Sequence, residues 1–465
     1  MDKDINKSIS KMDGLTHINK SFDIVRRDIT VCGRRCAVYF IDGLTKYDTV
    51  QHVKDTHIQR QEKMTADMNG LLSFCSGCVS YIEVRPVYGY DTAVSELLSG
   101  VSVMLCDGID GAVCMDCRKY PCRGIEEPEN DKVLRGSRVG FTETLTTNTA
   151  LIRRYIRTPS FITSPHRVGY DSKTDVIVCY IKGEADENYV KTLEDMIDKI
   201  NVGSLVLSSQ SLAECLIKNK WYNPFPKIKF TERPDCAAAH LLEGKVVVIT
   251  DNSPAVMILP STIFDFIQET DDFYLPPLIG TYLRFIRCSV FFLTLFLSPL
   301  WYLLISYPQW IPPWLDFIKV QEQAVMPIIF QLFVLEFAVD GLKLAALNTP
   351  SMLSGSFSII GGLILGDFAV RVGWFVPDTI FYMAFVAIAN FSQPSYELGY
   401  AFKFLRLLTL GLTALFGIYG FVSGFLIFIL LIATNRTVGG KSYLYPLIPF
   451  DGRALSTLIV RKRKK

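Results

Sequence analysis

The stretch CSVFFLTLFLSPLWYLLISYPQWIPPWL, Cys288–Leu315, contains no charged side chain. Uncharged, mostly apolar runs of about 18 or more residues are typical of membrane-spanning helices, because a hydrocarbon core of about 30 Å requires about 20 helical residues. Three more uncharged stretches follow, at Leu344–Gly366, Thr379–Tyr396 and Leu407–Asn435. The sequence therefore predicts an integral membrane protein whose carboxyl-terminal part is an all-α polytopic domain.

The charge balance changes near residue 280. Residues 1–280 hold 33 Lys+Arg and 38 Asp+Glu, whereas residues 281–465 hold 15 and 8. We predict a flexible amino terminus (1–20), two α/β subdomains (21–165 and 166–280), a membrane domain (281–436) and a cytosolic basic tail (437–465). The apolar segments of the membrane domain are expected at about 288–306, 326–347, 353–375, 378–391 and 405–434.

The orientation is predicted from the flanking charges. The amino terminus MDKDINKSISKMDG lacks the apolar core of a secretory signal, Arg284 and Arg287 precede the first apolar segment, and the chain ends in RKRKK. Both ends are therefore expected in the cytosol, which requires an even number of crossings, with four favoured. Segment 326–347 is our candidate for a re-entrant or interior helix, and segment 405–434 is long for one crossing and short for two. All cysteines precede residue 289, on the cytosolic side, where disulfides are unexpected.

The soluble part shows alternating strand and helix patterns. Residues 175–208 read as strand, helix, strand and predict a βαβ unit. The segment TERPDCAAAHLLEGKVVVITDNSPAVMILP, Thr231–Pro260, predicts a helix that ends near Gly244 and two strands flanking the turn DNSP. RRCAVYFIDGL predicts a strand, and SVMLCDGIDGAVCMD predicts a hairpin.

Motifs for catalysis are not found. The chain has no phosphate-binding glycine loop, nucleophile elbow or His-Glu-x-x-His helix, so we expect no enzyme and no resident cofactor. The run RGSRVGFTETLTTNTALIRRYIR, Arg135–Arg157, holds five arginines and one glutamate. Because the surrounding region is acidic overall, we do not expect nucleic acid to bind there.

Cysteine spacing allows one metal hypothesis. The pairs Cys75 with Cys78 and Cys114 with Cys117 are two Cys-x-x-Cys motifs that could form a four-thiolate zinc site, and Cys122 follows them. The alternative is a set of reduced, partly buried thiols.

Charged residues interrupt the apolar segments. Glu336, Asp340 and Lys343 are spaced by four and three and so share one helical face, and Asp367 and Arg371 are four apart. Charges at membrane depth cost about 2.5 to 3.5 kcal/mol each on insertion scales, so they face a bundle interior, a partner or water. One interpretation is an ion path; the other is that Asp340 pairs with Lys343 and Asp367 with Arg371 to hold the helices in register.

Small residues one helical turn apart suggest close helix packing. They occur in GLILG (Gly362, Gly366) and in GFVSG (Gly420, Gly424).

Several long stretches resemble one protein family. DCRKYPCRGIEEPENDKVLRGSRVGFTETLTTNTALIRRYIR, TERPDCAAAHLLEGKVVVITDNSPAVMILP, PPLIGTYLRFIR and the segments from LEFAVDGLKLAALNTP to PSYELGYAFKFLRLL are similar to the A subunits of GerA-type spore germination receptors. RGIEEPE, SPAVMILP and YPLIPFDGRAL most resemble the sporulation branch of that family. The resemblance covers about residues 22 to 455, and the cysteine pairs are not part of it.

The resemblance implies a function. It implies a spore inner-membrane protein with a cytosolic amino-terminal domain, which forms an oligomer with other germination membrane proteins and takes part in ion release or its amplification; the alternatives are a nutrient-receptor A subunit and a non-conducting scaffold. For Arg153, Arg154 and Arg157 it favours an intramolecular or assembly contact. The apolar face of that helix is expected to pack while these arginines emerge elsewhere, and the alternative is a solvated basic face.

Overall fold

The computed structural model describes residues 1–18, 20–31, 33–45, 71, 84–118, 137–217, 222–268, 275–320, 325–348 and 369–459. The chain divides into two compact units. Unit 1 comprises Met1–Asn219 and Ile228–Ser261, and unit 2 comprises Lys220–Lys227 and Thr262–Lys465. The division therefore falls at Ser261, earlier than the change in charge balance near residue 280 indicates.

Unit 1 begins with a helix and a five-stranded antiparallel sheet. Its elements are α1 (Ile5–Thr16), β1 (Ile24–Val31), β2 (Arg34–Ile41), β3 (Val84–Val87), α4 (Tyr90–Leu98), β4 (Ser102–Cys106) and β5 (Ala112–Met115). The strand order is β1-β2-β4-β5-β3. Along β4, Val103 and Leu105 enter one apolar cluster and Met104 and Cys106 the other, so both faces of this sheet are covered.

A second helix and sheet follow in unit 1. The elements are α5 (Leu145–Tyr155), β6 (Phe161–Val168), β7 (Thr174–Ile181), α6 (Glu187–Asp198), α7 (Ser209–Leu216), β8 (Lys229–Thr231), α8 (Pro234–Leu242), β9 (Val246–Thr250) and β10 (Val256–Leu259). The order β6-β7-β9-β10-β8 repeats that of the first sheet, with a helix before the first strand and another between the third and fourth. The α/β region is thus two copies of one topology, which the sequence analysis did not detect.

The predicted hairpin, the helix ending before Gly244 and the strands around DNSP are present as β4–β5, α8 and β9–β10. The βαβ unit is wrong: the strand β7 pairs with its neighbours antiparallel, and SLVLS forms a turn leading into α7. A subdomain boundary at residue 165 would cut β6, and α5 packs mainly in the core of the second sheet, with Ala150 also contacting the core of the first. The apolar runs gave the strands, but not their pairing partners.

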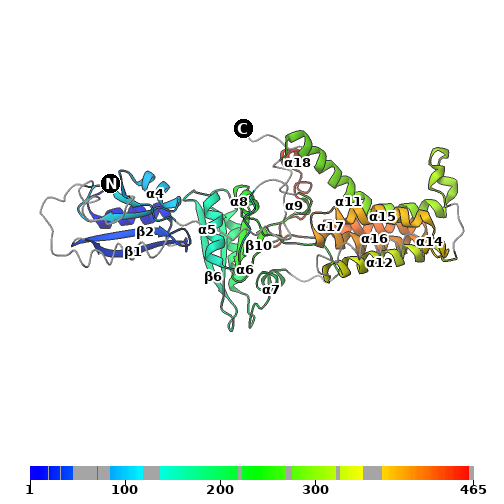
Figure 1. Ribbon diagram of the computed structural model, residues 1–465, viewed down its shortest axis with the longest axis horizontal. Helices are drawn as coiled ribbons and strands as arrows, with labels where there is room; N and C mark the ends of the chain where they lie inside the picture. Colours follow the sequence, from blue (N-terminus) through cyan, green and yellow to red (C-terminus); the bar gives the residue numbers. More distant parts are fainter. Residues whose placement is uncertain are drawn as a thin grey trace. The chain divides into compact units, whose positions relative to one another are not determined.

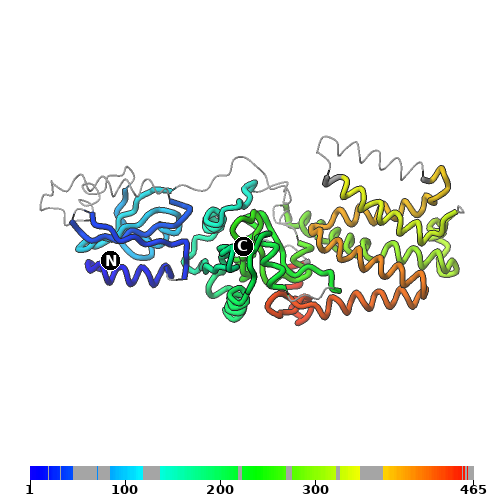
Figure 2. The backbone as a smooth tube through the Cα atoms, turned by 90° about the horizontal axis from the view of Figure 1, so that it is seen from below, coloured from blue at the N-terminus to red at the C-terminus, as the bar shows by residue number. Residues whose placement is uncertain are grey.

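The amino terminus contains a well-packed helix. Ile5, Ile9 and Met12 of α1 are buried against the first sheet, and Asp4 accepts a hydrogen bond from the Asn6 backbone N–H as an N-cap. In Figure 2, α1 (blue) runs along one face of that sheet. The expectation of a flexible segment over residues 1–20 is therefore wrong for Ile5–Thr16, because three apolar side chains at helical spacing fill the core.

Unit 2 is helical, as the sequence predicts. Its elements are α9 (Ile263–Ile267), α11 (Pro277–Ser306), the 3-10 helices η1 (Pro308–Trp310) and η2 (Pro313–Ile318), α12 (Ile328–Asn348), α14 (Ala369–Arg371), α15 (Pro377–Phe391), α16 (Tyr396–Phe416), α17 (Ile418–Ala433) and α18 (Gly452–Ile459). Among the described residues, α11 and α16 are long and apolar enough to cross a membrane, and α15 and α17 are shorter apolar helices. Figure 1 shows α14 at the opposite end of this unit from α18.

The last apolar run contains two helices. The chain turns at Gly417, whose φ of 57° is in the left-handed region that favours glycine, and α17 folds back along α16. Two helices fit because α16 already begins at Tyr396, before the expected start of the segment at residue 405. A Cβ atom on Gly420 would lie 1.9 Å from the Leu412 carbonyl oxygen, and one on Gly424 would lie 2.6 Å from Thr409 Oγ1. GFVSG is therefore a packing motif, whereas Gly362 and Gly366 lie outside the described residues.

We predict that Gly420→Ala destabilises unit 2 by about 3 kcal/mol or more, because the new methyl group meets backbone that cannot move aside. Gly411→Ala in α16 is the matched control, since the nearest atom to its Cβ would be Phe333 Cζ at 4.0 Å. That control should be neutral or stabilising, because alanine favours helix by about 1 kcal/mol over glycine. Denaturant unfolding of both variants in lipid bicelles measures this, and equal stability of the two would contradict the packing account.

A histidine on β6 carries a pH-dependent contact within unit 1. His166 Nδ1 lies 2.7 Å from Asp198 Oδ1, and Nε2 lies 3.7 Å from Glu194 Oε1, both acids being on α6. Hydrogen bonding to Glu194 is the main cause that raises the pKa of His166, with Asp198 adding and burial opposing. The same contact lowers the pKa of Glu194.

We therefore predict that His166 stabilises the α6–β6 contact fully below about pH 6.5 and that this contribution is lost as pH rises through its raised pKa. Hydrogen exchange of α6 should then differ most between the native chain and His166→Gln near about pH 6, and least near about pH 9. A difference that stays constant over this range would exclude the ion-pair contribution.

Candidate functional site

A buried ion pair joins two helices of unit 2. Arg406 of α16 donates from Nε to Glu336 Oε1 at 2.7 Å and from Nη2 to Glu336 Oε2 at 2.8 Å. Both side chains are almost fully buried. The remaining Arg406 nitrogen, Nη1, donates to the Thr294 carbonyl oxygen of α11. This fork geometry is the strongest arrangement for an arginine and a carboxylate, and here it connects three helices.

A second pair extends this contact along α12. Lys403, one turn before Arg406, donates to Asp340 Oδ2 and, at 3.1 Å, to the Glu336 carbonyl oxygen. Its Nζ also lies 3.4 Å from Glu336 Oε2. Two acids thus face two bases. We call Glu336, Asp340, Lys403 and Arg406 the charge network; its net charge is zero.

The network is deep in the helical unit. Glu336 lies eight residues after Ile328, the first residue of α12, which is about 12 Å along the helix at about 1.5 Å per residue. In a hydrocarbon core of about 30 Å this depth is near the middle. Separating the charges there would expose each to a medium of low dielectric constant, so the pairs strongly restrict how α12 and α16 can move relative to each other.

One edge of the network is incomplete within the described residues. Asp340 Oδ1 is buried and has no hydrogen-bond partner among them, although the Asp340 side chain as a whole is 27% exposed. On the other side, Gln393 donates to Thr294 Oγ1 at 3.0 Å, while its own Oε1 has no partner in the described chain. Both oxygens can therefore accept a hydrogen bond from water or from another group.

Of the charges that the sequence analysis grouped, the structure joins Glu336 and Asp340 in the charge network. Asp340 pairs with Lys403 of α16 rather than serving Lys343, whose ammonium lies over the rings of Phe391 and Tyr400, 4.5 Å and 5.5 Å from their centroids. Arg371 is exposed in α14, next to Gly373, whose carbonyl oxygen accepts from the Val325 N–H near the start of α12. Asp367 lies outside the described residues.

Lys403 and Arg406 are the side chains of the candidate site that the sequence analysis missed. They occur in YELGYAFKFLRLL, three residues apart, and so lie on one face of a helix, as do Glu336 and Asp340, which are four apart. The sequence therefore did contain an indication of the ion pairs: two bases in one apolar helix could neutralise two acids in another. The pairing of Asp340 with Lys343, one of the two interpretations, considered only neighbours within one helix.

Arg153 forms a buried contact in unit 1. It donates from Nε and Nη2 to Asp23 Oδ2 at 2.9 and 2.7 Å and from Nη1 to the Phe161 carbonyl oxygen at 3.2 Å. Thr163 donates to the other Asp23 oxygen at 2.6 Å. Since Asp23 precedes β1 and Arg153 belongs to α5, the pair ties the first sheet to the second. The expectation that Arg153 emerges from the packed face is wrong; Arg154 and Arg157 are exposed.

The described cysteines of the zinc hypothesis lie on different faces of one sheet. Cys114 belongs to the apolar cluster that includes Leu105, and Cys117 to the cluster that includes Cys106. Among described residues, no group of three or more His, Cys, Asp or Glu side chains is placed to hold a metal ion. Cys75, Cys78 and Cys122 lie outside the described residues, so the four-thiolate site stays a prediction that the separation of Cys114 and Cys117 does not favour.

Comparison with known proteins identifies the family. A family model described as Bacillus/Clostridium GerA spore germination protein matches residues 15–465. The chain belongs to the GerA family. The matched region includes Glu336 and Arg406, so the charge network lies within the part of the chain that the family model covers.

Individual relatives agree with this assignment. The GerA-family chain is 36% identical to stage V sporulation protein AF of Bacillus subtilis, over 96% of this chain and 90% of the relative. It is 29% identical to spore germination protein KA of B. subtilis (96% and 82% covered) and 30% identical to spore germination protein GerLA of Bacillus cereus (92% and 87% covered). The crystal structure of the amino-terminal domain of the A subunit of the Bacillus megaterium germinant receptor GerK3 matches 57% of this chain and 97% of that one at 25% identity, with a TM-score of 0.41. The resemblance to the sporulation branch is confirmed.

We predict that Glu336→Gln destabilises unit 2 of this GerA-family chain by about 3 to 5 kcal/mol, because Arg406 is left buried without its carboxylate. The double variant Glu336→Gln/Arg406→Gln should recover at least half of that loss, since the uncompensated charge is then removed as well. Unfolding in lipid bicelles measures the coupling as a double-mutant cycle. A double variant less stable than Glu336→Gln alone would contradict it.

For unit 1 we predict that Arg153→Gln loosens the link between the two sheets, at a cost of about 3 to 5 kcal/mol, because Asp23 is left buried without a base. Arg154→Gln is the matched control and should change stability by no more than about 0.5 kcal/mol, since that side chain is exposed. Hydrogen exchange of β1 and β6 in the full-length chain distinguishes the two variants. Equal protection in the two variants would show that the buried pair does not join the sheets.

Proposed function

We propose that this chain is a non-enzymatic membrane subunit of the spore germination apparatus, that it forms a homo-oligomer, and that it takes part in ion release or the amplification of ion release. Its amino-terminal α/β region would lie in the cytosol of the spore and its helices in the spore inner membrane. Other germination membrane proteins are its proposed partners. No metal ion or cofactor is required by this proposal.

The observation that supports an ion-related role is the charge network with its incomplete edge. Glu336 and Arg406 satisfy each other's charge and hydrogen bonds, and with the bond to Thr294 this pair holds α11, α12 and α16 together. Asp340 has an unpartnered oxygen within the described residues and is partly exposed, and Lys343 lies one turn further along the same helix. In an oligomer, a ring of Asp340 and Lys343 side chains would line a hydrated path, as rings of charged side chains do in ion-selective pores.

A scaffold is the second candidate, and one observation favours it. The four charges of the network pair with each other and sum to zero, as expected when ion pairs only fix helix register. In that case the membrane unit would hold partners in place without passing ions. The two candidates differ in what neutralising Asp340 does.

The test is ion flux through the purified full-length chain in liposomes. We expect the native chain to conduct, and Asp340→Asn to change the cation-to-anion permeability ratio by about fivefold, equivalent to about 1 kcal/mol of electrostatic free energy. Asp195→Asn, an exposed acid in α6, is the control and should leave the ratio unchanged.

Oligomer size is measured on the same samples, so that loss of assembly is separated from loss of conduction. A native oligomer that conducts equally well with Asp340→Asn would remove Asp340 from the path. An oligomer that passes no ion would favour the scaffold.

A further inference from the structure

Aromatic side chains gather at one end of unit 2. Tyr307 at the end of α11 stacks on Trp310 of η1, with centroids 4.8 Å apart. Gly417, between α16 and α17, lies against the Tyr307 hydroxyl. The Gln331 side chain of α12 accepts from the Val376 N–H at the start of α15. The ends of these helices therefore meet here.

Most of these rings face outward. We call Trp310, Trp314, Phe317, Trp374 and Tyr419 the aromatic belt; each is 46% to 82% exposed. Exposed tryptophan and tyrosine at the ends of apolar helices are typical of the boundary between the hydrocarbon core and the lipid headgroups. Trp301, one turn inside this end on α11, is by contrast 2% exposed and donates to the Ile318 carbonyl oxygen at 3.2 Å, which folds η2 back against α11.

The length of α11 agrees with this placement of the boundary. Counting back from Ser306, about 20 residues at about 1.5 Å per residue cover a core of about 30 Å and reach Arg287, the nearest charged residue on that helix. The charge-free part of α11 thus spans from Arg287 to the aromatic belt. The headgroup region lies beyond Ser306.

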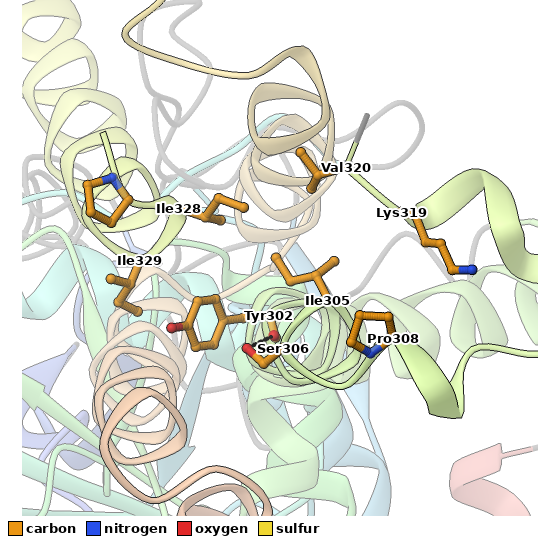
Figure 3. Close-up of a pocket in the computed structure, with 9 residues that line it drawn as sticks. Tyr302, Ile305, Ser306, Pro308, Lys319, Val320, Ile328 and Ile329 are labelled. Atoms are coloured by element: carbon orange, nitrogen blue, oxygen red, sulfur yellow. Dashed lines mark hydrogen bonds between the residues drawn. The ribbon is translucent and has the colours of Figure 1, made fainter. Parts of the chain in front are cut away.

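A cavity opens at this level. It has a volume of about 400 Å³ and is partly open to the outside. Its lining includes Ile305 of α11, Ile328 and Ile329 of α12, and Lys319 after η2. Figure 3 shows the apolar side chains of α11 and α12 around it, with Lys319 at one margin. A cavity that is apolar on its inner side and has a base at its rim, at the headgroup boundary, matches an amphiphile with an anionic head.

We propose that this cavity is a binding site for one anionic phospholipid, with an acyl chain between Ile305, Ile328 and Ile329 and the phosphate at Lys319. The Lys319 ammonium pairs with Asp316, three residues earlier. An ammonium has three N–H donors, so this pair leaves donors for a phosphate oxygen. The proposal requires that unit 2 is in a membrane, but not that it passes ions.

The test uses the full-length chain in nanodiscs of phosphatidylcholine with about one fifth phosphatidylglycerol, and counts the lipids retained by native mass spectrometry. We expect the native chain to retain phosphatidylglycerol in preference to phosphatidylcholine. Lys319→Gln should reduce that preference about fivefold, the effect of one lysine near an anionic surface. Asp316→Asn is the matched control: it breaks the ion pair but keeps the base, so the preference should persist or rise.

Filling the cavity tests the acyl-chain part. Ile329→Trp should lose the retained lipid, whereas Phe330→Trp, at an exposed neighbouring position, should retain it. Retention by Ile329→Trp equal to that of the native chain, or an unchanged preference in Lys319→Gln, overturns the proposal. Displacement by millimolar inorganic phosphate also overturns it, because the site would then recognise free phosphate rather than a lipid.

A second measurement does not depend on variants at the cavity. In a chain whose only tryptophan is Trp314, lipids brominated near the headgroup end of their acyl chains should quench the fluorescence. A chain that keeps only the buried Trp301 should be quenched at least about threefold less. Equal quenching of the two would place the belt away from the lipid boundary and remove the basis of the site.

Discussion

A charge in the interior of an apolar helix bundle needs an opposite charge at hydrogen-bonding distance. The bidentate contact between Glu336 and Arg406 meets that requirement, and the rest of unit 2 is arranged around it. It fixes the register of α12 against α16, and through the Thr294 carbonyl oxygen it includes α11. The antiparallel return of α17 then follows from Gly420 and Gly424, which let two backbones approach where larger side chains could not fit.

The same constraint holds in the α/β region. Asp23, just before β1, and Arg153, on α5, are both buried and far apart in the sequence. Thr163 also donates to Asp23, and Arg153 also donates to the Phe161 carbonyl oxygen. Replacing such a pair by apolar residues can be neutral, whereas breaking it is costly. The pair therefore contributes mainly to specificity, because its directional hydrogen bonds favour one arrangement of the two sheets.

The charge network combines two properties that a membrane subunit of the germination apparatus would need. The Glu336–Arg406 pair is fully hydrogen-bonded and so restricts the movement of the helices. Asp340 Oδ1, by contrast, can accept a hydrogen bond from a further partner or from water. At the end of the bundle, the cavity beside Lys319 is the proposed phospholipid site. These two sites are at different depths and involve different chemistry, so that lipid binding and ion passage can be tested separately.

The sequence by itself determined the features that depend on local composition. Uncharged runs predicted apolar helices, the apolar runs in RRCAVYFI and SVMLC predicted strands, and long collinear motifs indicated the family. It did not determine which strands pair, so a βαβ unit was expected where both sheets are antiparallel and share one order. Nor did it show that Asp340 would meet Lys403 rather than Lys343, or that Arg153 would be buried with Asp23. The physical reason is that periodicity reports which face of an element is apolar, whereas the partner of a buried charge is chosen by packing between elements distant in the chain.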